Sequence, residues 1–279
     1  MKSKNFKKNI QRVIKIVSPK YEQFIFHIWY NRTKRLLFKT PENKFIFILC
    51  PPYCGSTLIN QVVSSSSKVS VNNFFGTREG QQLPTLRTMM FDNENRWDEN
   101  YDHDWKFIKN EWMKYWDITK PFLLEKSPSN ILRAESIDEV FANSHYIITY
   151  RNPYAHCEGI MRRNKATAEY AANFTIKCLY HQKKNIEMLQ NKVVMSYEEI
   201  TTNRNEFRNK IISMLPELND ISVDKKFSAH NQYNKNLEIS NLNQKQIEKL
   251  SKQDLIKINN IFSKEEELLE YFGYKLINF

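Results

Sequence analysis

A strand-length apolar segment that runs into a glycine-centred turn is the feature that most constrains the fold of this chain. Residues 44–50 (KFIFILC) are almost continuously apolar, a pattern typical of a parallel strand that is buried on both faces. The strand ends at Pro51-Pro52, and a helix is predicted to begin at Ser56 or Thr57, just after Gly55. This order presents backbone N–H groups and two hydroxyls to an anion. The segment therefore predicts an α/β fold, with either an anion site or a simple capped turn after the strand.

The remaining segments alternate between the two kinds of secondary structure. Strands are expected at residues 122–125, 146–150 and 193–195, with a short one inside 68–82, and helices at about 105–116, 166–190 and 204–272. This alternation implies a three-layer α/β/α domain with a mainly parallel sheet of about four or five strands. Because no repeat and no break in composition occurs in residues 44–279, we expect one domain there, preceded by a helical arm at 1–43.

The positive charge of the chain is concentrated in that arm. The net charge is +11, and residues 1–43 carry eleven basic and two acidic side chains, which leaves only +2 for the other 236 residues. The main domain therefore lacks the basic face that a nucleic-acid-binding protein would need, and we expect no nucleic-acid partner. The arm, with its aromatic segment 24–30 (FIFHIWY), could lie on an anionic membrane or bind a polyanion. The simpler interpretation is a helix that packs its apolar stripe on the domain and leaves its lysines in solvent.

Cysteine content and hydropathy indicate the compartment. The four cysteines show neither a disulfide framework nor metal-ligand spacing, so a reducing environment is expected. No segment has the roughly 20 apolar residues of a membrane span, and no signal peptide is recognised. These features predict a cytoplasmic protein, with the arm as its only means of reaching a membrane surface. The acidic segment 92–104, which holds Asp98, Asp102, His103 and Asp104, is interpreted as a solvated loop rather than a metal site.

Two further strand ends carry candidate ligand-binding residues. Arg151 follows the strand at 146–150, and Lys126 follows the strand at 122–125. In open α/β sheets, ligands bind at the carboxyl ends of the strands, and a guanidinium can bind two phosphate oxygens at once. Arg151 could instead pair with a surface carboxylate. No lysine follows Gly55, so the turn lacks the pattern of Mg-dependent nucleotide triphosphatases and kinases.

The segments Pro52–Leu58, Glu125–Pro128 and Arg151–Pro153, in this order, resemble the sulfotransferases that use 3′-phosphoadenosine 5′-phosphosulfate (PAPS). Tyr197–Glu199 resembles the family's Tyr-Glu-Asp segment, and Leu268–Tyr274 resembles its closing helix. The resemblance spans about residues 44–275 and implies a P-loop-like nucleotide-binding fold.

The resemblance also implies roles for individual residues. The turn would bind the 5′-phosphosulfate of PAPS, Arg151 the 3′-phosphate, and Tyr197 would lie near the adenine. The turn residues concerned are Tyr53, Cys54, Gly55, Ser56, Thr57 and Leu58. Glu125–Pro128 is similar to a segment of the carbohydrate-acting branch, which makes a carbohydrate the expected acceptor. The family needs no metal.

Two positions depart from the family pattern. Tyr53 stands where the family usually has an arginine or lysine that stabilises the transferring sulfuryl group, and Gly159 stands where many members have a serine that contacts the 3′-phosphate. We expect Lys126 to supply the missing cation. The 3′-phosphate would be held by the N–H of Gly159, or by Arg162 or Arg163 one turn further on.

Sulfuryl transfer also needs a base for the acceptor hydroxyl, and Glu79 is the first candidate. It lies between two of the chain's five glycines, Gly76 and Gly80, where several sulfotransferases place a catalytic glutamate. Burial would raise its pKa and Lys126 would lower it, so a small net shift is expected. The alternative is a surface glutamate paired with Arg78. The reserve candidates for the base are His103 and His156.

The resemblance thus implies an enzyme that moves a sulfuryl group from PAPS to a hydroxyl or amine acceptor and releases 3′,5′-adenosine bisphosphate (PAP). A non-catalytic module of the same fold, binding PAP, another nucleotide or a polyanion, is the main alternative, and the loss of the cation at Tyr53 favours it. A relative of the P-loop kinases is a third possibility, against which the absence of a lysine after Gly55 argues.

Overall fold

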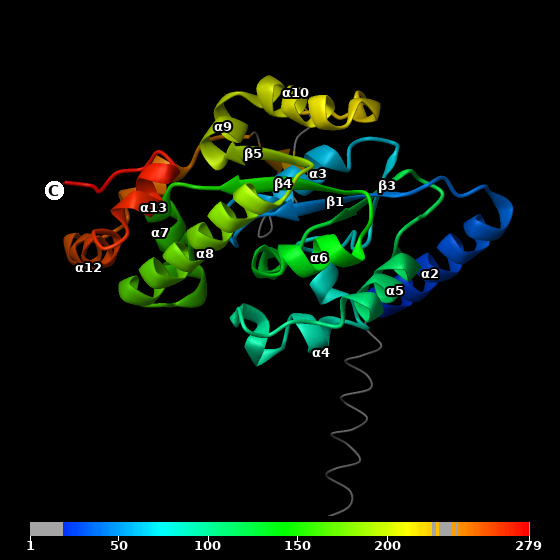
Figure 1. Ribbon diagram of the computed structural model, residues 1–279, viewed down its shortest axis with the longest axis horizontal. Helices are drawn as coiled ribbons and strands as arrows, with labels where there is room; N and C mark the ends of the chain where they lie inside the picture. Colours follow the sequence, from blue (N-terminus) through cyan, green and yellow to red (C-terminus); the bar gives the residue numbers. More distant parts are fainter. Residues whose placement is uncertain (1–18, 225–226, 229–235, 238, 279) are drawn as a thin grey trace, which may run out of the picture.

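A five-stranded parallel sheet in the order β2-β3-β1-β4-β5 lies at the centre of the computed structural model (Figure 1). The structure describes residues 19–224, 227–228, 236–237 and 239–278. The strands of the sheet are β1 (Lys44–Leu49), β2 (Val69–Val71), β3 (Phe122–Glu125), β4 (Ser144–Tyr150) and β5 (Lys192–Ser196). A separate antiparallel pair consists of β6 (Phe227–Ser228) and β7 (Asn236–Leu237). The predicted parallel α/β sheet is confirmed.

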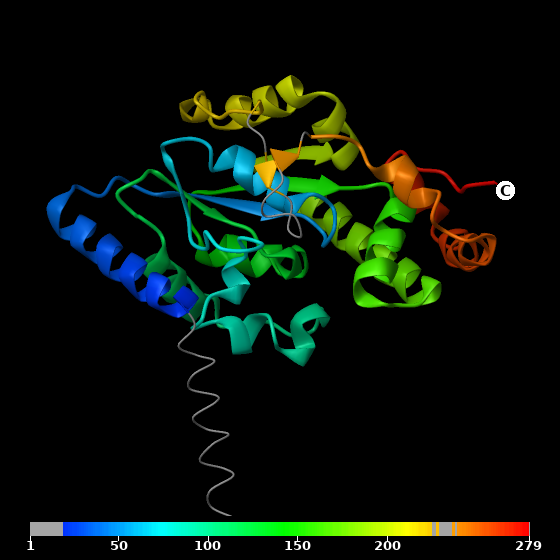
Figure 2. The same cartoon turned by 180° about the vertical axis from the view of Figure 1, so that it is seen from behind.

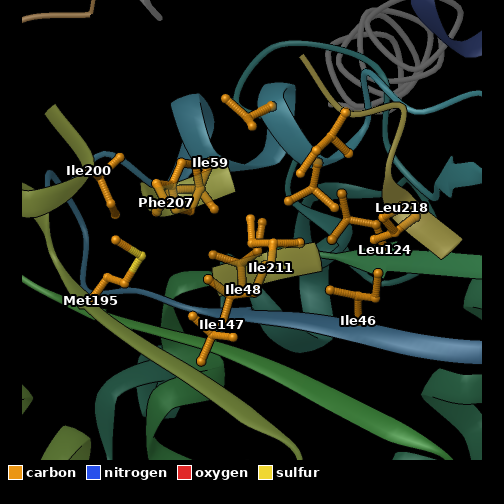
Figure 3. Close-up of a cluster of buried hydrophobic side chains, with 14 of the residues drawn as sticks. Ile46, Ile48, Ile59, Leu124, Ile147, Met195, Ile200, Phe207, Ile211 and Leu218 are labelled. Atoms are coloured by element: carbon orange, nitrogen blue, oxygen red, sulfur yellow. The ribbon is translucent and has the colours of Figure 1, made fainter. Parts of the chain in front are cut away.

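The continuous apolar run of β1 is explained by burial on both faces of the sheet. Ile46 and Ile48 belong to one hydrophobic cluster, whereas Phe45, Phe47 and Leu49 belong to another on the opposite face. Alternate side chains of a strand point to opposite faces, so a central strand covered on both sides has no position for a polar residue. Figure 3 shows the first cluster, in which Ile46 and Ile48 meet side chains from neighbouring strands and from the helices above them.

The helices cover both faces of the sheet, as the three-layer prediction requires. The first cluster lies under α3 (Ser56–Val63), α9 (Tyr197–Thr202) and α10 (Arg204–Met214), and the second under α5 (Trp105–Tyr115), α6 (Ala134–Val140) and α8 (Ala168–Met188). A third cluster joins α7 (Pro153–Asn164) and α8 to α12 (Lys252–Phe262) and α13 (Glu266–Tyr271). The short helices are η1 (Gly80–Gln82), α4 (Arg87–Met90), η2 (Glu94–Trp97), η3 (Pro128–Leu132), η4 (Pro216–Leu218) and α11 (Asn243–Ile247).

The C-terminal third is less regular than predicted. Residues 204–272 do not form a continuous helical stretch, because α10 ends at Met214 just before Pro216, and β6 and β7 separate it from α11. Proline has no backbone N–H and so cannot donate the hydrogen bond that would continue a helix. The helices expected at 105–116 and 166–190 are present as α5 and α8.

The order of the strands creates a crevice at β1. After β1 the chain passes through α3 to β2 and then to β3 on one side, and it next crosses to β4 on the other side. Ligands of open α/β sheets bind where the strand order reverses in this way, outside the carboxyl ends of the strands. The turn after β1 is therefore flanked by the ends of β3 and β4.

The N-terminal helix α2 (Pro19–Leu37) packs on α5 at the opposite end of the molecule from α12 and α13 (Figures 1 and 2). It docks through the buried ring of Phe24, which packs against Phe74 and Phe75. It also docks through polar side chains, namely His27, Asn31, Lys34 and Arg35. The interpretation that an apolar stripe packs inward is correct for Phe24 and Ile28, whereas the other large apolar side chains of α2 are exposed. The expectation that the lysines stay in solvent is wrong for Lys34, which pairs with Asp117. The preceding residues, 1–18, lie outside the described residues. No helix in the described part of the chain is long and apolar enough to cross a membrane.

Candidate functional site

The turn between β1 and α3 exposes the start of a helix. Gly55 occupies the position before the first turn of α3 with a φ of 93°, and no side chain caps the helix there. The first backbone hydrogen bond of this turn runs from the N–H of Ile59 to the carbonyl of Gly55, at 3.2 Å. The preceding N–H groups have no acceptor within the helix, and with the helix dipole they favour an anion. The helix begins at Ser56, as predicted, and its capping position is Gly55.

Gly55 is also required by its neighbour Tyr197. A Cβ atom built on Gly55 would lie 3.1 Å from Cδ2 of the Tyr197 ring, and the positive φ disfavours other residues in any case. Cys54 and Leu58 turn their side chains to the hydrophobic cluster on this face of the sheet. These two residues can therefore act on a ligand only through their backbone N–H groups.

Tyr53 and Gly159, the two departures from the family pattern, are in contact with each other. A Cβ atom on Gly159 would lie 3.2 Å from Cβ of Tyr53. The Tyr53 hydroxyl donates to Oδ1 of Asn164 at 2.5 Å, and the guanidinium of Arg163 lies 5.6 Å from the centre of the Tyr53 ring. Tyr53 thus lies along α7, and the absence of a side chain at Gly159 leaves room for it.

The structure leaves less of α7 available to a phosphate than predicted. Gly159 lies inside the helix, where its N–H serves the helical hydrogen bonds, so the expectation that this N–H binds the 3′-phosphate is wrong. Arg162 is paired with Glu158, with 2.6 Å between its Nε and Oε1 of the carboxylate. Arg163 is engaged with the ring of Tyr53.

Arg151 lies buried at the end of β4, directly beside the turn. Its Nη1 donates to the carbonyl of Tyr53 at 2.8 Å, and its guanidinium carbon lies 4.1 Å from the centre of the Tyr197 ring. Its Nε donates to Oδ1 of Asn243 at 2.7 Å, and its Nη2 donates to Oε1 of Gln246. The alternative of a pairing with a surface carboxylate is wrong, because the partners are a carbonyl and two carboxamides.

Asn243 and Gln246 of α11 are site residues that the sequence analysis missed. The amide of Asn243 donates to Glu198, and that of Gln246 donates to Glu158. Each carboxamide therefore connects the cationic Arg151 to a carboxylate. Helix α11 has only five residues and no apolar periodicity, so no sequence pattern indicates that it folds over this strand end.

Glu79 and Lys126 form a buried ion pair on the other side of the crevice. Nζ of Lys126 lies 3.2 Å from Oε1 of Glu79, and the side chains are 1% and 10% exposed. Oε2 of Glu79 accepts hydrogen bonds from Nε2 of Gln81 at 2.6 Å and of Gln82 at 2.9 Å. The alternative pairing with Arg78 is wrong, because Arg78 donates to Asn60 in α3 and to Ser64 just after it.

Opposing effects set the pKa of Glu79. Burial raises it, but the charge of Lys126 and the hydrogen bonds from Gln81 and Gln82 outweigh burial, and the pKa lies below its ordinary value. The small net shift expected from the sequence took account of burial and Lys126 but not of the two amides. The carboxylate therefore stays ionised through the neutral range.

The loop that carries Glu79 is held by the segment after β3. Ser127 donates to Glu125 and accepts a hydrogen bond from the N–H of Gln81 at 3.0 Å. A side chain on Gly80 would clash with the Glu125 carboxylate, which explains this glycine. Burial raises the pKa of Glu125 to about 7. Glu125 and Ser127, with Ser129 donating to Oε1 of Gln81, thus orient the side chains around Glu79.

A third cation, Arg96, was also missed. Its guanidinium carbon lies 4.4 Å from the ring centre of Phe91 and 5.3 Å from that of Trp97, and its buried Nε has no hydrogen-bond partner among the described residues. Its positive charge adds to the effects that lower the pKa of Glu79. Arg96 lies in the segment 92–104, which the sequence predicts as a solvated acidic loop, and no motif distinguishes this arginine.

The two reserve bases are poorly suited to the role. His103 is buried between the rings of Tyr101 and Trp105, and burial together with the charge of Arg133 lowers its pKa to about 4. His156 is a buried residue of α7 with Nδ1 3.1 Å from the Thr175 hydroxyl, and burial and the nearby Arg151 lower its pKa to about 3. His156 does not cap α7, since the side chain of Asn152 does so.

No cluster of three or more His, Cys, Asp or Glu side chains that could hold a metal ion occurs among residues with described positions. All four cysteines are buried and unpaired. Burial raises the pKa of Cys50, in the strand end before the turn, to about 11, although the charges of Lys126 and Arg151 lower it. Both cations therefore act on the same strand end, one from each side of the crevice.

Comparison with known proteins gives a family match and several structural likenesses. The model of a family described as "Sulfotransferase family" matches residues 46–215. The sulfotransferase domain from the curacin biosynthetic pathway is similar in structure, with a TM-score of 0.51 and 16% identity over 86% of this chain and 100% of that domain. Sulfotransferase STF9 from Mycobacterium avium gives a TM-score of 0.51 and 12% identity over 90% of this chain and 82% of STF9. None of the curated proteins matches. At these identities the structural likeness shows the fold, whereas the family match covers more than half of the chain.

Proposed function

Because the chain belongs to the sulfotransferase family, we propose that it transfers a sulfuryl group from PAPS to a hydroxyl or amine, with a carbohydrate hydroxyl as the expected acceptor. The observation that supports this most is the convergence of three elements at adjacent strand ends. The exposed start of α3 follows β1, the Lys126–Glu79 pair lies beside the end of β3, and Arg151 ends β4. An anion site, a base and two cations are thus available around one crevice.

The residues around the turn fit a nucleotide that carries two separate anionic groups. The N–H groups at the start of α3 suit the 5′-phosphosulfate, because a helix N-terminus binds anions through its unpaired donors and its dipole. Arg151 suits the 3′-phosphate, because a guanidinium binds phosphate oxygens through paired N–H groups. Tyr197 packs against both Gly55 and Arg151, so it lies between the two phosphate positions and offers a ring edge for the adenosine.

The other side of the crevice supports the chemistry. PAPS supplies a sulfuryl group attached to a phosphate leaving group. Glu79, ionised at neutral pH, takes the proton from the acceptor hydroxyl as its oxygen attacks the sulfur. Lys126, together with Arg96, stabilises the negative charge on the sulfuryl and leaving oxygens and so replaces the cation that Tyr53 does not provide. Gln81 and Gln82 keep one carboxylate oxygen of Glu79 in place.

The choice of a carbohydrate rests on the resemblance of Glu125–Pro128 to the carbohydrate-acting branch. In this structure Glu125 and Ser127 orient the Glu79 loop rather than reach toward an acceptor. The segment therefore holds the base loop in this structure, and the choice of a carbohydrate depends on the resemblance alone. We also propose a cytoplasmic location, which agrees with four buried free thiols.

A second candidate function is a non-catalytic module that binds PAP or a related nucleotide. Two observations favour it. The side chain of Tyr53 lies along α7 and brings no charge to the turn, and every oxygen of Glu79 already accepts a hydrogen bond or ion pair. This candidate predicts nucleotide binding without turnover.

Calorimetry with three nucleotides tests both candidates. PAP should bind more tightly than adenosine 5′-phosphosulfate, which lacks the 3′-phosphate, and ATP should bind weakly. Arg151→Ala should weaken PAP binding by about 2–4 kcal/mol, or roughly 30- to 1000-fold, while leaving adenosine 5′-phosphosulfate nearly unaffected. Arg87→Ala, which removes an exposed arginine paired with Asp92, is the matched control.

The outcomes separate the hypotheses. Equal affinity of the Arg151→Ala variant and the natural chain for PAP would contradict the assigned 3′-phosphate site. Tight PAP binding with no release of PAP from PAPS in the presence of a panel of saccharides would favour the non-catalytic module. Formation of a sulfated saccharide would establish both the transfer and the acceptor class.

A further inference from the structure

The outward face of α2 is a stripe of large apolar side chains. Phe26, Trp29 and Tyr30 are 64%, 60% and 46% exposed, and Leu36 and Leu37 near the end of the helix are 82% and 71% exposed. On a helix with 3.6 residues per turn these positions share one side. Phe26 lies 6.1 Å from Trp29 and 6.5 Å from Tyr30 between ring centres, so the aromatic side chains form one contiguous patch.

The inward face of α2 is held by specific polar contacts. His27 and Asn31 bond to the carbonyl of Tyr115 at 2.9 and 2.8 Å, and Lys34 pairs with Asp117 at 2.7 Å. Arg35 donates to carbonyls at the end of α5. Turning the aromatic stripe toward the domain would break all of these contacts. The rotation of the helix that exposes the stripe is therefore fixed by the domain itself.

The sequence that contains this stripe is strongly basic. Residues 1–39 carry eleven basic side chains and Glu22 as the only acidic one, and the first 18 residues have six basic and no acidic side chains. A second copy of the chain would bring the same positive charge to the stripe and would be repelled. An anionic partner with an apolar layer satisfies both the charge and the exposed rings.

We propose that the aromatic stripe of α2, flanked by the basic N-terminal segment, binds peripherally to anionic lipid bilayers. Tryptophan and tyrosine rings prefer the boundary between headgroups and acyl chains. An interfacial helix of this kind buries its apolar face at that boundary while nearby lysines and arginines attract anionic headgroups. The proposal does not depend on sulfotransfer, because α2 packs at the end of the molecule away from α12 and α13 and contributes no residue to the site.

Vesicle flotation with the full-length chain tests this proposal. The chain should float with vesicles that contain phosphatidylcholine and phosphatidylserine, and only weakly with phosphatidylcholine alone. Raising the salt concentration should weaken the binding, because headgroup attraction is screened. The Phe26→Ser/Trp29→Ser variant should lose at least tenfold in the partition coefficient. Its thermal unfolding should match that of the natural chain, since both side chains are exposed.

A matched control removes exposed aromatic residues elsewhere. Tyr170 and Tyr180 on α8 are 54% and 63% exposed, and the Tyr170→Ser/Tyr180→Ser variant should float like the natural chain. The proposal is overturned if the natural chain does not float, or if the α2 variant floats as well as the control. It is also overturned if analytical ultracentrifugation shows a dimer that only the α2 variant abolishes, because the stripe would then bind a second copy. PAP calorimetry on the α2 variant should be unchanged, which separates this test from that of the catalytic site.

Discussion

Replacing Lys126 by methionine tests the buried ion pair most directly. The variant keeps much of the side-chain volume but leaves the Glu79 carboxylate without its cation. At the observed 3.2 Å and an effective dielectric constant of about 20, the attraction between two unit charges is about 5 kcal/mol. Gln81 and Gln82 still donate to the carboxylate, and removal of one partner of a buried pair typically destabilises a protein by about 3–5 kcal/mol. We therefore expect a loss of about 3 kcal/mol in the free energy of unfolding at pH 8.

The loss should depend on pH in a defined direction. In the natural chain the pKa of Glu79 lies below its unfolded value, so its ionised form contributes stability above about pH 4.3, and this stability disappears as the pH falls through the folded-state pKa. Without Lys126, burial should raise the folded-state pKa above the unfolded value. The destabilisation of the variant should then grow as the pH rises from about 4, and it should be smaller at pH 5 than at pH 8.

Urea unfolding at the two pH values, followed by circular dichroism, measures this effect. Adding Glu79→Gln to Lys126→Met should restore part of the stability at pH 8, which gives a non-zero coupling energy in a double-mutant cycle. Lys106→Met, on the exposed side of α5, should change stability by less than about 0.5 kcal/mol. A Lys126→Met variant that unfolds like the Lys106→Met control, or a double variant whose loss is the sum of the single losses, would refute the reasoning.

The remaining predictions concern turnover and the Tyr53–Gly159 contact. Glu79→Gln should keep PAP affinity but lose about 10²- to 10⁴-fold in turnover. Turnover of the natural chain should fall only in acid, because the pKa of Glu79 is lowered. Stopped assays across pH 4–8 check both statements. Gly159→Ser should destabilise the chain by about 1 kcal/mol in urea unfolding through its close approach to Cβ of Tyr53. Tyr53→Gly in the same chain should remove that loss, and a loss that persists would contradict the steric reason.

The sequence was informative wherever hydrophobic burial determines the structure. The run at 44–50 alternates between two hydrophobic clusters, so its period and length sufficed to place β1 and the turn after it. Lys126 and Arg151 follow from the same argument, because residues directly after parallel strands meet at one edge of the sheet. The family resemblance added Glu79, which the structure brings to Lys126.

The sequence did not indicate the polar contacts between distant segments. Helix α2 docks through His27, Asn31 and Lys34, whose partners lie more than 80 residues away, and such contacts leave no periodic pattern. The same holds for Asn243 and Gln246, which reach Arg151 across more than 90 residues. Hydrophobic periodicity indicates the apolar face of a helix. Most of the apolar face of α2 is exposed, and its polar contacts fix how it packs on the domain.

If Arg151 binds the 3′-phosphate as proposed, the two carboxamides of α11 compete with the nucleotide for its donors. They occupy the Nε and Nη2 donors of Arg151, the edge with which a guanidinium binds two phosphate oxygens side by side. A nucleotide that binds this edge must displace Asn243 and Gln246, which are tethered beside Arg151 at a fixed effective concentration. Its apparent affinity is therefore the difference between its own contacts with Arg151 and those of the two carboxamides. On the proposed assignment, small anions such as buffer sulfate should compete poorly against that tethered pair. A nucleotide that also binds at the start of α3 should displace it.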